Sequence, residues 1–379
     1  MSLPPLSLYV HLPWCERKCP YCDFNSHERA GIPEQHYIDA LLADLRVDLP
    51  LLQGRSVETV FIGGGTPSLF SVAGISALLA GIAGLLPLSG AAEITLEANP
   101  GSAEAEKFRG FREAGVNRLS LGIQSFDDAC LEALGRVHDS KQACTAIEHA
   151  LAAGFDSFNL DLMHGLPGQD AGGACADLRQ ALRYRPPHLS WYQLTIEPNT
   201  AFHKRPPTLP GEEGLADIQE AGESLLQAAG YRQYEVSAYS LPGRECRHNL
   251  NYWTFGDYLG IGAGAHGKIT LGGGGIRRQA KKRRPESYMG ASGAGFTATT
   301  RLLGPEDIPG EFMLNALRLN RGFSLTQFTA RTGLSAATVV PAIEDLCAKS
   351  LLRLDDGQVV TTARGRRFLD DVVATFFPD

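Results

Sequence analysis

Short apolar runs alternate with longer helical patterns through roughly the first 230 residues of the chain. The apolar runs lie at residues 6–12, 59–63, 93–99, 118–125, 157–165 and 188–195. The helical patterns lie at residues 34–50, 71–86, 103–114, 141–153, 173–184 and 213–229. Strand, helix and strand at this spacing form βαβ units, which build a parallel sheet. Six such units are fewer than the eight of a closed barrel, so the pattern predicts an α/β fold with an open, curved, partial (β/α)6 barrel.

Polar or glycine-rich segments follow the predicted strands. A cysteine cluster follows the first strand, and the second ends in Gly-Gly-Gly-Thr-Pro at residues 63–67. The third ends at Glu97, the fourth at Gln124, and the fifth carries Asp161. Ligands of parallel α/β sheets bind at the carboxyl ends of the strands. The pattern therefore predicts one ligand site that all these segments share.

The pattern changes beyond about residue 235 and predicts three domains. Residues 1–235 form the barrel, residues 236–305 form a mixed segment rich in glycine and aromatic residues, and residues 306–379 form a helical unit. Within this last unit, helical patterns at residues 325–334 and 336–350 precede two short strands within residues 351–362. Two helices followed by a β-hairpin resemble a winged helix.

The composition, with 44% hydrophobic and 20% charged residues, is typical of a folded globular protein. No apolar run reaches the roughly 18 residues of a membrane span, and no secretory signal is visible. Three cysteines cluster within eight residues, and five are scattered at positions 130, 144, 175, 246 and 347. Because disulfide frameworks belong to small secreted domains, we expect a cytoplasmic location, with peripheral contact at the inner membrane face left open. The scattered cysteines are expected to pack as small apolar side chains.

The three clustered cysteines, Cys15, Cys19 and Cys22, have the spacing CxxxCxxC. Three thiolates can hold three irons of a [4Fe–4S] cluster and leave the fourth iron open to a chelating ligand. The amino and carboxylate groups of a methionine moiety suit that iron, and a reduced cluster can break the adjacent carbon–sulfur bond. The alternative is a zinc site with His11 or His27 as fourth ligand, although structural zinc usually takes two pairs of ligands.

Cysteines in this spacing after a first β-strand, with a partial barrel behind them, resemble the radical S-adenosylmethionine (SAM) superfamily. Four segments are similar to the oxygen-independent coproporphyrinogen III oxidase group within it. These are Tyr-Val-His-Leu-Pro-Trp-Cys at residues 9–15, Gly-Gly-Gly-Thr-Pro at 63–67, Leu-Ser-Leu-Gly-Ile-Gln-Ser-Phe at 119–126 and Asp-Leu-Met-His-Gly-Leu-Pro-Gly at 161–168.

The resemblance implies a role for each matching residue, without assigning a catalytic residue. The implied SAM contacts are Tyr9 beside the sulfonium, Gly64, Gly65 and Thr66 at the amino group, Glu97, Gln124 and Asp161 at the ribose and amino-acid parts, and Arg136 at the carboxylate. The chemistry agrees, because glycine permits close backbone approach and arginine is a natural carboxylate partner.

Two features favour one branch of this group. The oxidases carry a further cysteine two residues after the third, where this chain has Phe24. Cys-Asp-Phe-Asn-Ser-His at residues 22–27 instead resembles the HemW-type heme chaperones. The segment His248-Asn-Leu-Asn-Tyr252-Trp253 fits the HNxxYW pattern that this resemblance implicates in heme binding. Imidazole is a usual axial ligand of heme iron, so His248 is the first candidate and His266 the second; a core histidine is the alternative.

Three hypotheses follow: a heme chaperone, a coproporphyrinogen III oxidase, and a cluster-bearing regulatory or nucleic-acid module. Residues 277–284 carry six cations, which fit a solvated loop or strand edge, or a contact to heme propionates or an anionic membrane. Residues 311–379 contain eight Lys and Arg and eight Asp and Glu, which gives no basic footprint for nucleic acid. The expected partners are heme-accepting proteins, with respiratory enzymes at the cytoplasmic membrane among the candidates, and an electron donor; a homodimer is left open.

Overall fold

The computed structural model describes residues 3–101 and 106–378. Six parallel strands follow one another across the sheet in chain order: β1 (Leu6–Leu12), β4 (Val57–Gly64), β5 (Leu88–Ala98), β6 (Arg118–Gln124), β7 (Phe158–His164) and β8 (His188–Gln193). All six predicted strands are thereby confirmed. Every residue of β1 except Tyr9 is buried, as is typical of parallel strands that are covered on both faces.

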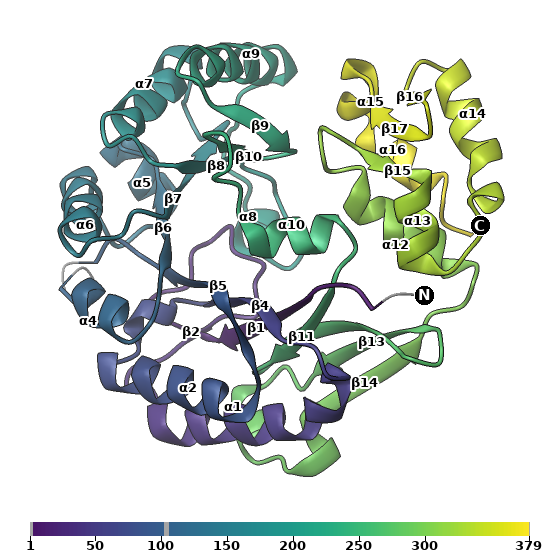
Figure 1. Ribbon diagram of the computed structural model, residues 1–379. Coiled ribbons are helices and arrows are strands. Elements are labelled where there is room, and N and C mark those ends of the chain that lie inside the picture. Colours follow the sequence, from purple (N-terminus) through teal and green to yellow (C-terminus); the bar gives the residue numbers. More distant parts are fainter. Residues whose placement is uncertain (1–2, 102–105, 379) are drawn as a thin grey trace.

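The helices that follow these strands cover the outer face of the curved sheet (Figure 1). They are α1 (Glu34–Asp48), α2 (Val72–Leu85), α4 (Phe108–Glu113), α6 (Ser140–Ala152), α7 (Ala171–Leu182) and α9 (Glu212–Ala228). Side-chain caps fix several starts: Ser71 accepts the N–H of Gly74, and Asp170 accepts that of Gly173. The six predicted helices are confirmed, except that residues 103–105 of one of them lie outside the described part of the chain.

Residues 236–305 extend the barrel sheet. Strand β11 (Asp257–Ile261) pairs in parallel with β1, and β12 (His266–Thr270), β13 (Ile276–Lys281) and β14 (Thr297–Leu302) continue it in antiparallel pairs. At the other end, β10 (Ala238–Ser240) and β9 (Arg232–Glu235) add to β8. The result is a sheet of twelve strands among the described residues. The proposed domain boundaries remain a prediction.

The basic run at residues 277–284 is neither a plain loop nor an edge strand, which corrects that interpretation. It begins in β13, between β12 and β14. Lys281 is 2% exposed, and its Nζ donates to Asp44 at 2.6 Å and to Asp48 at 2.7 Å. Arg278 donates to the hydroxyl of Tyr258 at 2.6 Å. Part of the run is therefore consumed by internal contacts.

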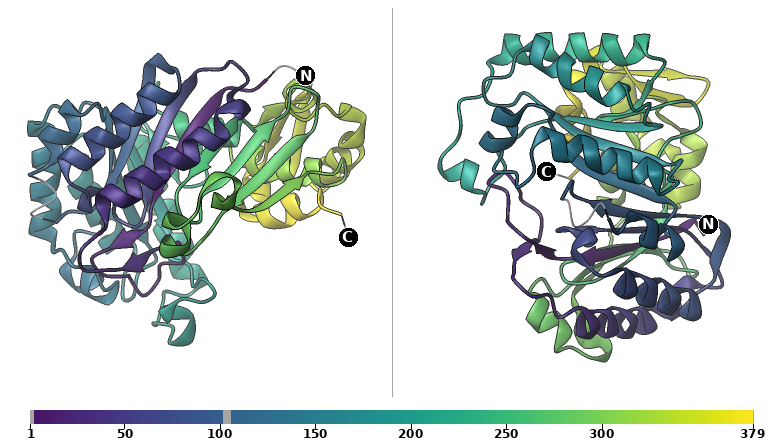
Figure 2. Two further views of the ribbon diagram at one scale, coloured as in Figure 1. Left: turned by 90° about the horizontal axis from the view of Figure 1, so that it is seen from below. Right: turned by 90° about the vertical axis from the view of Figure 1, so that its left-hand side faces the viewer.

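The C-terminal unit lies at the side of the molecule away from α4 and α6 (Figures 1 and 2). It contains α12 (Asp307–Ala316), α13 (Leu325–Thr332), α14 (Val340–Ala348), α15 (Ala363–Arg367), α16 (Leu369–Ala374) and a small sheet of β15 (Phe323–Ser324), β16 (Leu352–Asp355) and β17 (Gln358–Thr361). This unit has a hydrophobic core of its own, which also includes Phe255 and Ile276 from the preceding segment. The helices and the hairpin agree with the predicted winged-helix-like unit.

Candidate functional site

The cysteine loop begins directly after β1. A small parallel pair, β2 (Trp14–Cys15) with β3 (His27–Glu28), closes the loop at its base. Within it, the N–H of Cys22 donates to the carbonyl of Cys19 at 3.1 Å and forms a turn. Cys15, Cys19 and Cys22 are half-buried and free of disulfides. Burial raises the pKa of Cys15, and the thiols of Cys22 and Cys19 raise it further, whereas the hydrogen bond from Thr66 opposes the shift.

Each of these thiols has its own polar neighbour. Thr66 donates to Sγ of Cys15 at 3.6 Å, and Nη1 of Arg136 donates to Sγ of Cys19 at 3.5 Å. The hydroxyl of Ser26 lies 3.6 Å from Sγ of Cys22. Over residues 3–101 and 106–378, no three His, Cys, Asp or Glu side chains converge tightly enough to hold a single metal ion. The assignment of the three cysteines to a cluster stays a prediction.

The glycine segment after β4 approaches the cysteine loop closely. Gly64 has φ +121°, and a Cβ on it would lie 2.7 Å from the ring of His11. A Cβ on Gly65 would lie 2.4 Å from the carbonyl oxygen of Trp14. The N–H of Thr66 donates to that same carbonyl at 2.8 Å. Only glycine fits at these two positions, so the segment is built for contact between backbone and its neighbours.

Two carboxyl groups face the same edge of the sheet from β5 and β7. Glu97 accepts the N–H of Gly64 at 3.1 Å. Burial raises the pKa of Glu97 to about 8; the charge of Asp161 raises it further, and the Gly64 N–H opposes this. Burial also raises the pKa of Asp161, which accepts hydrogen bonds from Ser120 at 3.0 Å and Asn159 at 2.8 Å. Two carboxyls shifted in this way mark a functional-site candidate.

Arg136 connects the cysteine loop to these strand ends. Its Nη2 donates to Asn99 at 2.7 Å and to the carbonyl of Gly122 at 2.9 Å. Its Nε is buried without a hydrogen-bond partner among the described residues. Gln124, with φ +69°, accepts the hydroxyl of Tyr192 at 2.8 Å. The predicted SAM residues therefore lie at one site.

Sequence reasoning missed Asn99 and Tyr192. Asn99 donates to Thr66 at 2.9 Å while it accepts from Arg136, so it links two predicted ligand residues. Its position two residues after Glu97, at the end of the same strand, was an available signal. Tyr192 lies near the end of β8, the one barrel strand from which no site residue was predicted.

A cavity of about 800 Å³ opens beside this site, within the roughly 300–1,000 Å³ usual for ligand sites. Tyr9, Gly64 and Glu97 line one end of it. The rest of its lining includes Phe24, Tyr252, Trp253, Tyr258, His266 and Arg283. The wall is thus rich in aromatic rings and also contains two histidines, His11 and His266, and one arginine.

The predicted heme ligand His248 lies inside the protein instead. It is 1% exposed on α10 (Arg247–Trp253), and it does not line the cavity. Its Nδ1 lies 2.7 Å from Thr59 Oγ1, and its Nε2 lies 2.9 Å from the hydroxyl of Tyr252. Burial lowers the pKa of His248 to about 3, and nearby Arg118 lowers it further, so the ring is neutral. In this conformation, His248 has no free ring nitrogen for iron.

The structure also shows the surroundings of the two candidate zinc ligands, His11 and His27, and of the five scattered cysteines. His11 has both ring nitrogens engaged, with the Tyr9 hydroxyl at 3.0 Å and the carbonyl of Asn25 at 3.0 Å. His27 Nε2 is buried and has no partner among the residues described. The scattered cysteines at positions 130, 175 and 246 are buried, as predicted, whereas those at 144 and 347 are half-buried.

Known proteins agree with this architecture. The radical SAM superfamily profile matches residues 9–175, and the profile of the HemN C-terminal domain matches residues 303–368. The solved structure of coproporphyrinogen III oxidase (HemN) from Escherichia coli has a TM-score of 0.83 at 24% identity, and the match covers 99% of this chain and 90% of that one. At that identity the likeness shows the fold alone. Fold and profile together define the class: a radical SAM protein.

Whole-length relatives narrow this class. Heme chaperone HemW of Escherichia coli strain K12 is 49% identical over 380 residues, which cover all of both chains. Heme chaperone HemW of Bacillus subtilis strain 168 is 36% identical, with 98% of each chain covered. The mouse mitochondrial radical S-adenosyl methionine domain-containing protein 1 is 37% identical over 98% of this chain and 87% of its own. The chain belongs to the HemW family.

Proposed function

We propose that this protein is a heme chaperone that binds heme, holds a SAM-ligated [4Fe–4S] cluster and transfers heme to acceptor proteins. The observation that carries the proposal is the 49% identity to a heme chaperone over the whole of both chains. An aromatic cavity large enough for a substantial ligand lies directly beside the cysteine loop and supports it. Aromatic rings offer flat apolar surface to a macrocycle.

The cysteine loop fits the cluster. Cys15, Cys19 and Cys22 are the proposed ligands, and Thr66 and Arg136 donate hydrogen bonds to the sulfur atoms of Cys15 and Cys19, as residues that orient metal ligands do. When bound, the cluster supplies the electron that breaks a carbon–sulfur bond of SAM. The proposal does not depend on this cleavage during heme transfer.

The strand ends fit SAM. Arg136 has a buried, unpartnered Nε among the described residues and is the proposed partner of the methionine carboxylate. Gly64, Gly65 and Thr66 are proposed to receive the amino group, where glycine allows close approach. The ribose and the remaining amino-acid contacts are assigned to Glu97, Gln124 and Asp161, and Tyr9 is placed beside the sulfonium.

The alternative function is an oxygen-independent coproporphyrinogen III oxidase, which would decarboxylate two propionates. The oxidases of this group carry a further cysteine where this chain has Phe24. Phe24 is 62% exposed and lines the cavity, so an apolar ring occupies this position. A phenyl ring has no lone pair for iron, and we therefore expect no oxidase turnover.

The partners follow from the proposed transfer. Heme-accepting proteins are the expected class, with respiratory enzymes at the cytoplasmic membrane, an electron donor and a second copy of the chain as further predictions. Among the helices described, none has the length and apolarity needed to cross a bilayer.

The test is anaerobic reconstitution of the full chain, followed by parallel assays of heme binding, heme transfer and coproporphyrinogen turnover. We expect stoichiometric heme binding, transfer to a heme-free acceptor, and no turnover in the presence of SAM and reductant. Conversion of coproporphyrinogen to protoporphyrinogen would move the protein to the oxidase class. Failure to bind heme would refute the chaperone function.

A further inference from the structure

The cavity joins two functional regions that are far apart in the sequence. Its lining includes Phe24 and Asn25, which follow Cys22 within the cysteine loop, and the segment that carries His266 and Arg283. Asn25 ties the two together, because its Nδ2 donates to the carbonyl of Ala263 at 2.8 Å and to that of Arg283 at 2.9 Å. A ligand in this cavity would therefore contact the segment next to the cysteines and the start of β12 at the same time.

Hydrogen bonds engage both ring nitrogens of His248. The Thr59 hydroxyl donates to Ser7 at 2.7 Å, so it accepts from Nδ1 of His248. Nε2 of His248 then accepts the hydroxyl hydrogen of Tyr252. Its one free lone pair is thereby used, and an imidazole without a lone pair cannot ligate iron.

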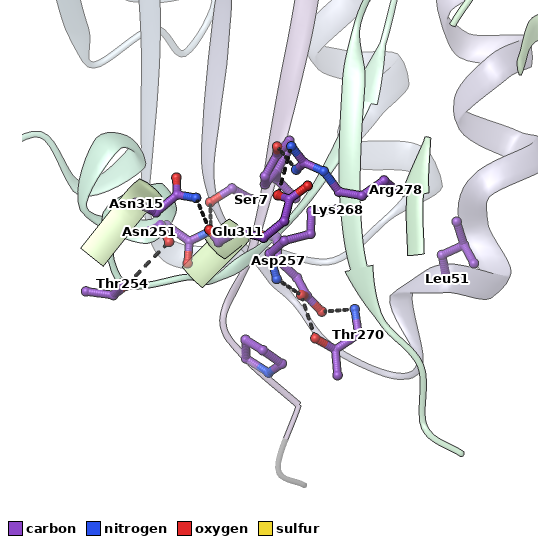
Figure 3. A network of polar contacts seen from close by, with 12 residues as sticks. Ser7, Leu51, Asn251, Thr254, Asp257, Lys268, Thr270, Arg278, Glu311 and Asn315 are labelled. Carbon is purple, nitrogen blue, oxygen red and sulfur yellow. Dashed lines mark hydrogen bonds and ion pairs between the residues drawn. The ribbon is translucent and has the colours of Figure 1, made fainter. Parts of the chain in front are cut away.

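Neighbouring contacts anchor the same helix. Asn251 donates to Ser7 at 2.8 Å and to the carbonyl of Asp257 at 2.8 Å, deep in the network of Figure 3. Asp257 in turn accepts from Lys268 at 3.0 Å. His248 and Asn251 thus hold α10 against the sheet from inside, while Tyr252 and Trp253 line the cavity.

His266 is arranged differently. It is the first residue of β12, exposed, and part of the cavity lining. In the described part of the structure, its ring makes no hydrogen bond. Arg283, also exposed, lines the same cavity and presents a guanidinium that suits a carboxylate. Tyr252 and Tyr258 complete the wall and pack edge to face, with ring centroids 4.5 Å apart.

We infer that His266 is the axial ligand of heme in this cavity, that Arg283 pairs with a heme propionate, and that His248 is a positioning residue that holds Tyr252 in the wall. This inference rests on the proposed chaperone function and assigns its binding site.

The test is a heme titration of the reconstituted full-length protein, followed by absorbance and EPR of the bound heme. His266→Ala should weaken binding by at least about tenfold and change the spectrum, since metal sites lose 10–100-fold even when a supporting residue is removed. His248→Ala should weaken binding yet leave the spectrum of the bound heme unchanged. His149→Ala, on the exposed face of α6, is the matched control and should change neither.

A ligand exchange separates coordination from loss of structure. His266→Met should still bind heme, with a new spectrum and a higher reduction potential, because a thioether ligand raises the potential. Wild-type affinity and spectrum in His266→Ala would overturn the inference. A spectrum altered only in His248→Ala would assign the ligand to His248. A wild type that binds no heme refutes the proposed function itself, which is a different result from either.

Discussion

Glu97 provides a measurable link between the site and folding stability. Its carboxyl lies at the cavity wall and accepts one hydrogen bond, from the N–H of Gly64. Burial raises its pKa from 4.5 to about 8, with Asp161 adding to the effect. A folded-state pKa above the unfolded value means that the protonated carboxyl is favoured in the folded state. The stabilisation is therefore fully present below pH 4.5 and is lost as the pH rises towards 8.

The magnitude follows from the two pKa values. When the pKa of a carboxyl rises from 4.5 to about 8 on folding, its ionisation lowers the free energy of unfolding by at most about 5 kcal/mol, at about 1.4 kcal/mol for each pKa unit. The cavity admits solvent, which screens charge, so we expect about 2–3 kcal/mol. Glu97→Gln mimics the protonated carboxyl. Its free energy of unfolding should match that of the wild type at pH 4.5 and exceed it by this amount at pH 8.5.

The assay is equilibrium unfolding of the cluster-free and ligand-free protein from pH 4.5 to 9. Asp161, whose pKa is also raised, is present in both proteins, so the difference between their curves reports Glu97 together with its interaction with Asp161. Glu148→Gln, at an exposed position on α6, is the control and should run parallel to the wild type. Parallel curves for Glu97→Gln and the wild type would refute the reasoning.

The remaining predictions concern the cluster, SAM and the core. Cys19→Ala should abolish cluster absorbance and iron binding after reconstitution, whereas the buried control Cys130→Ala should retain about four irons; a full cluster in Cys19→Ala would contradict the ligand assignment. Arg136→Lys should weaken SAM binding, followed through the EPR signal of the reduced cluster, by roughly 1.5–3 kcal/mol because the planar fork is lost; equal affinity would remove Arg136 from the site. Lys281→Met should cost about 3–5 kcal/mol in unfolding free energy because it leaves Asp44 and Asp48 buried without their countercharge; a loss below about 1 kcal/mol would contradict the ion-pair role of Lys281.

The strands and helices of the barrel could be predicted because the sequence pattern of each element lies within that element. Parallel strands buried on both faces appear as continuous apolar runs, and the helices between them show their own period. Strand β11 was missed, because a five-residue strand that precedes glycine-rich turns has little periodicity of its own. Its place beside β1 depends on pairing between residues 6–10 and 257–261. These two segments are separated by most of the chain, so no local pattern indicates that they pair.

The residues of the proposed SAM site could be grouped from the sequence for a geometric reason. Parallel strands in chain order bring their carboxyl ends to one edge, so a polar residue at each strand end is near every other. Glu97, Gln124 and Asp161 were found in this way, and Asn99 belongs to the same pattern. Arg136 could be assigned to this site only through the family resemblance. It does not lie at a strand end but follows a short helix, and its long side chain extends to the site.

The proposed heme ligand could not be identified from sequence spacing. His248 and Tyr252 are four residues apart on a helix, so their side chains share a face. The same spacing that suggests two groups presented to heme also lets the tyrosine hydroxyl satisfy the imidazole, at 2.9 Å. The second partner, Thr59, lies 189 positions away in the sequence and becomes a neighbour only through the fold. Whether a histidine is free to bind iron depends on what engages its ring nitrogens, and for His248 one of the two partners is distant in sequence. The HNxxYW pattern therefore marks the wall of the cavity, and His266, whose ring has no partner within the described structure, is the residue left to meet the metal.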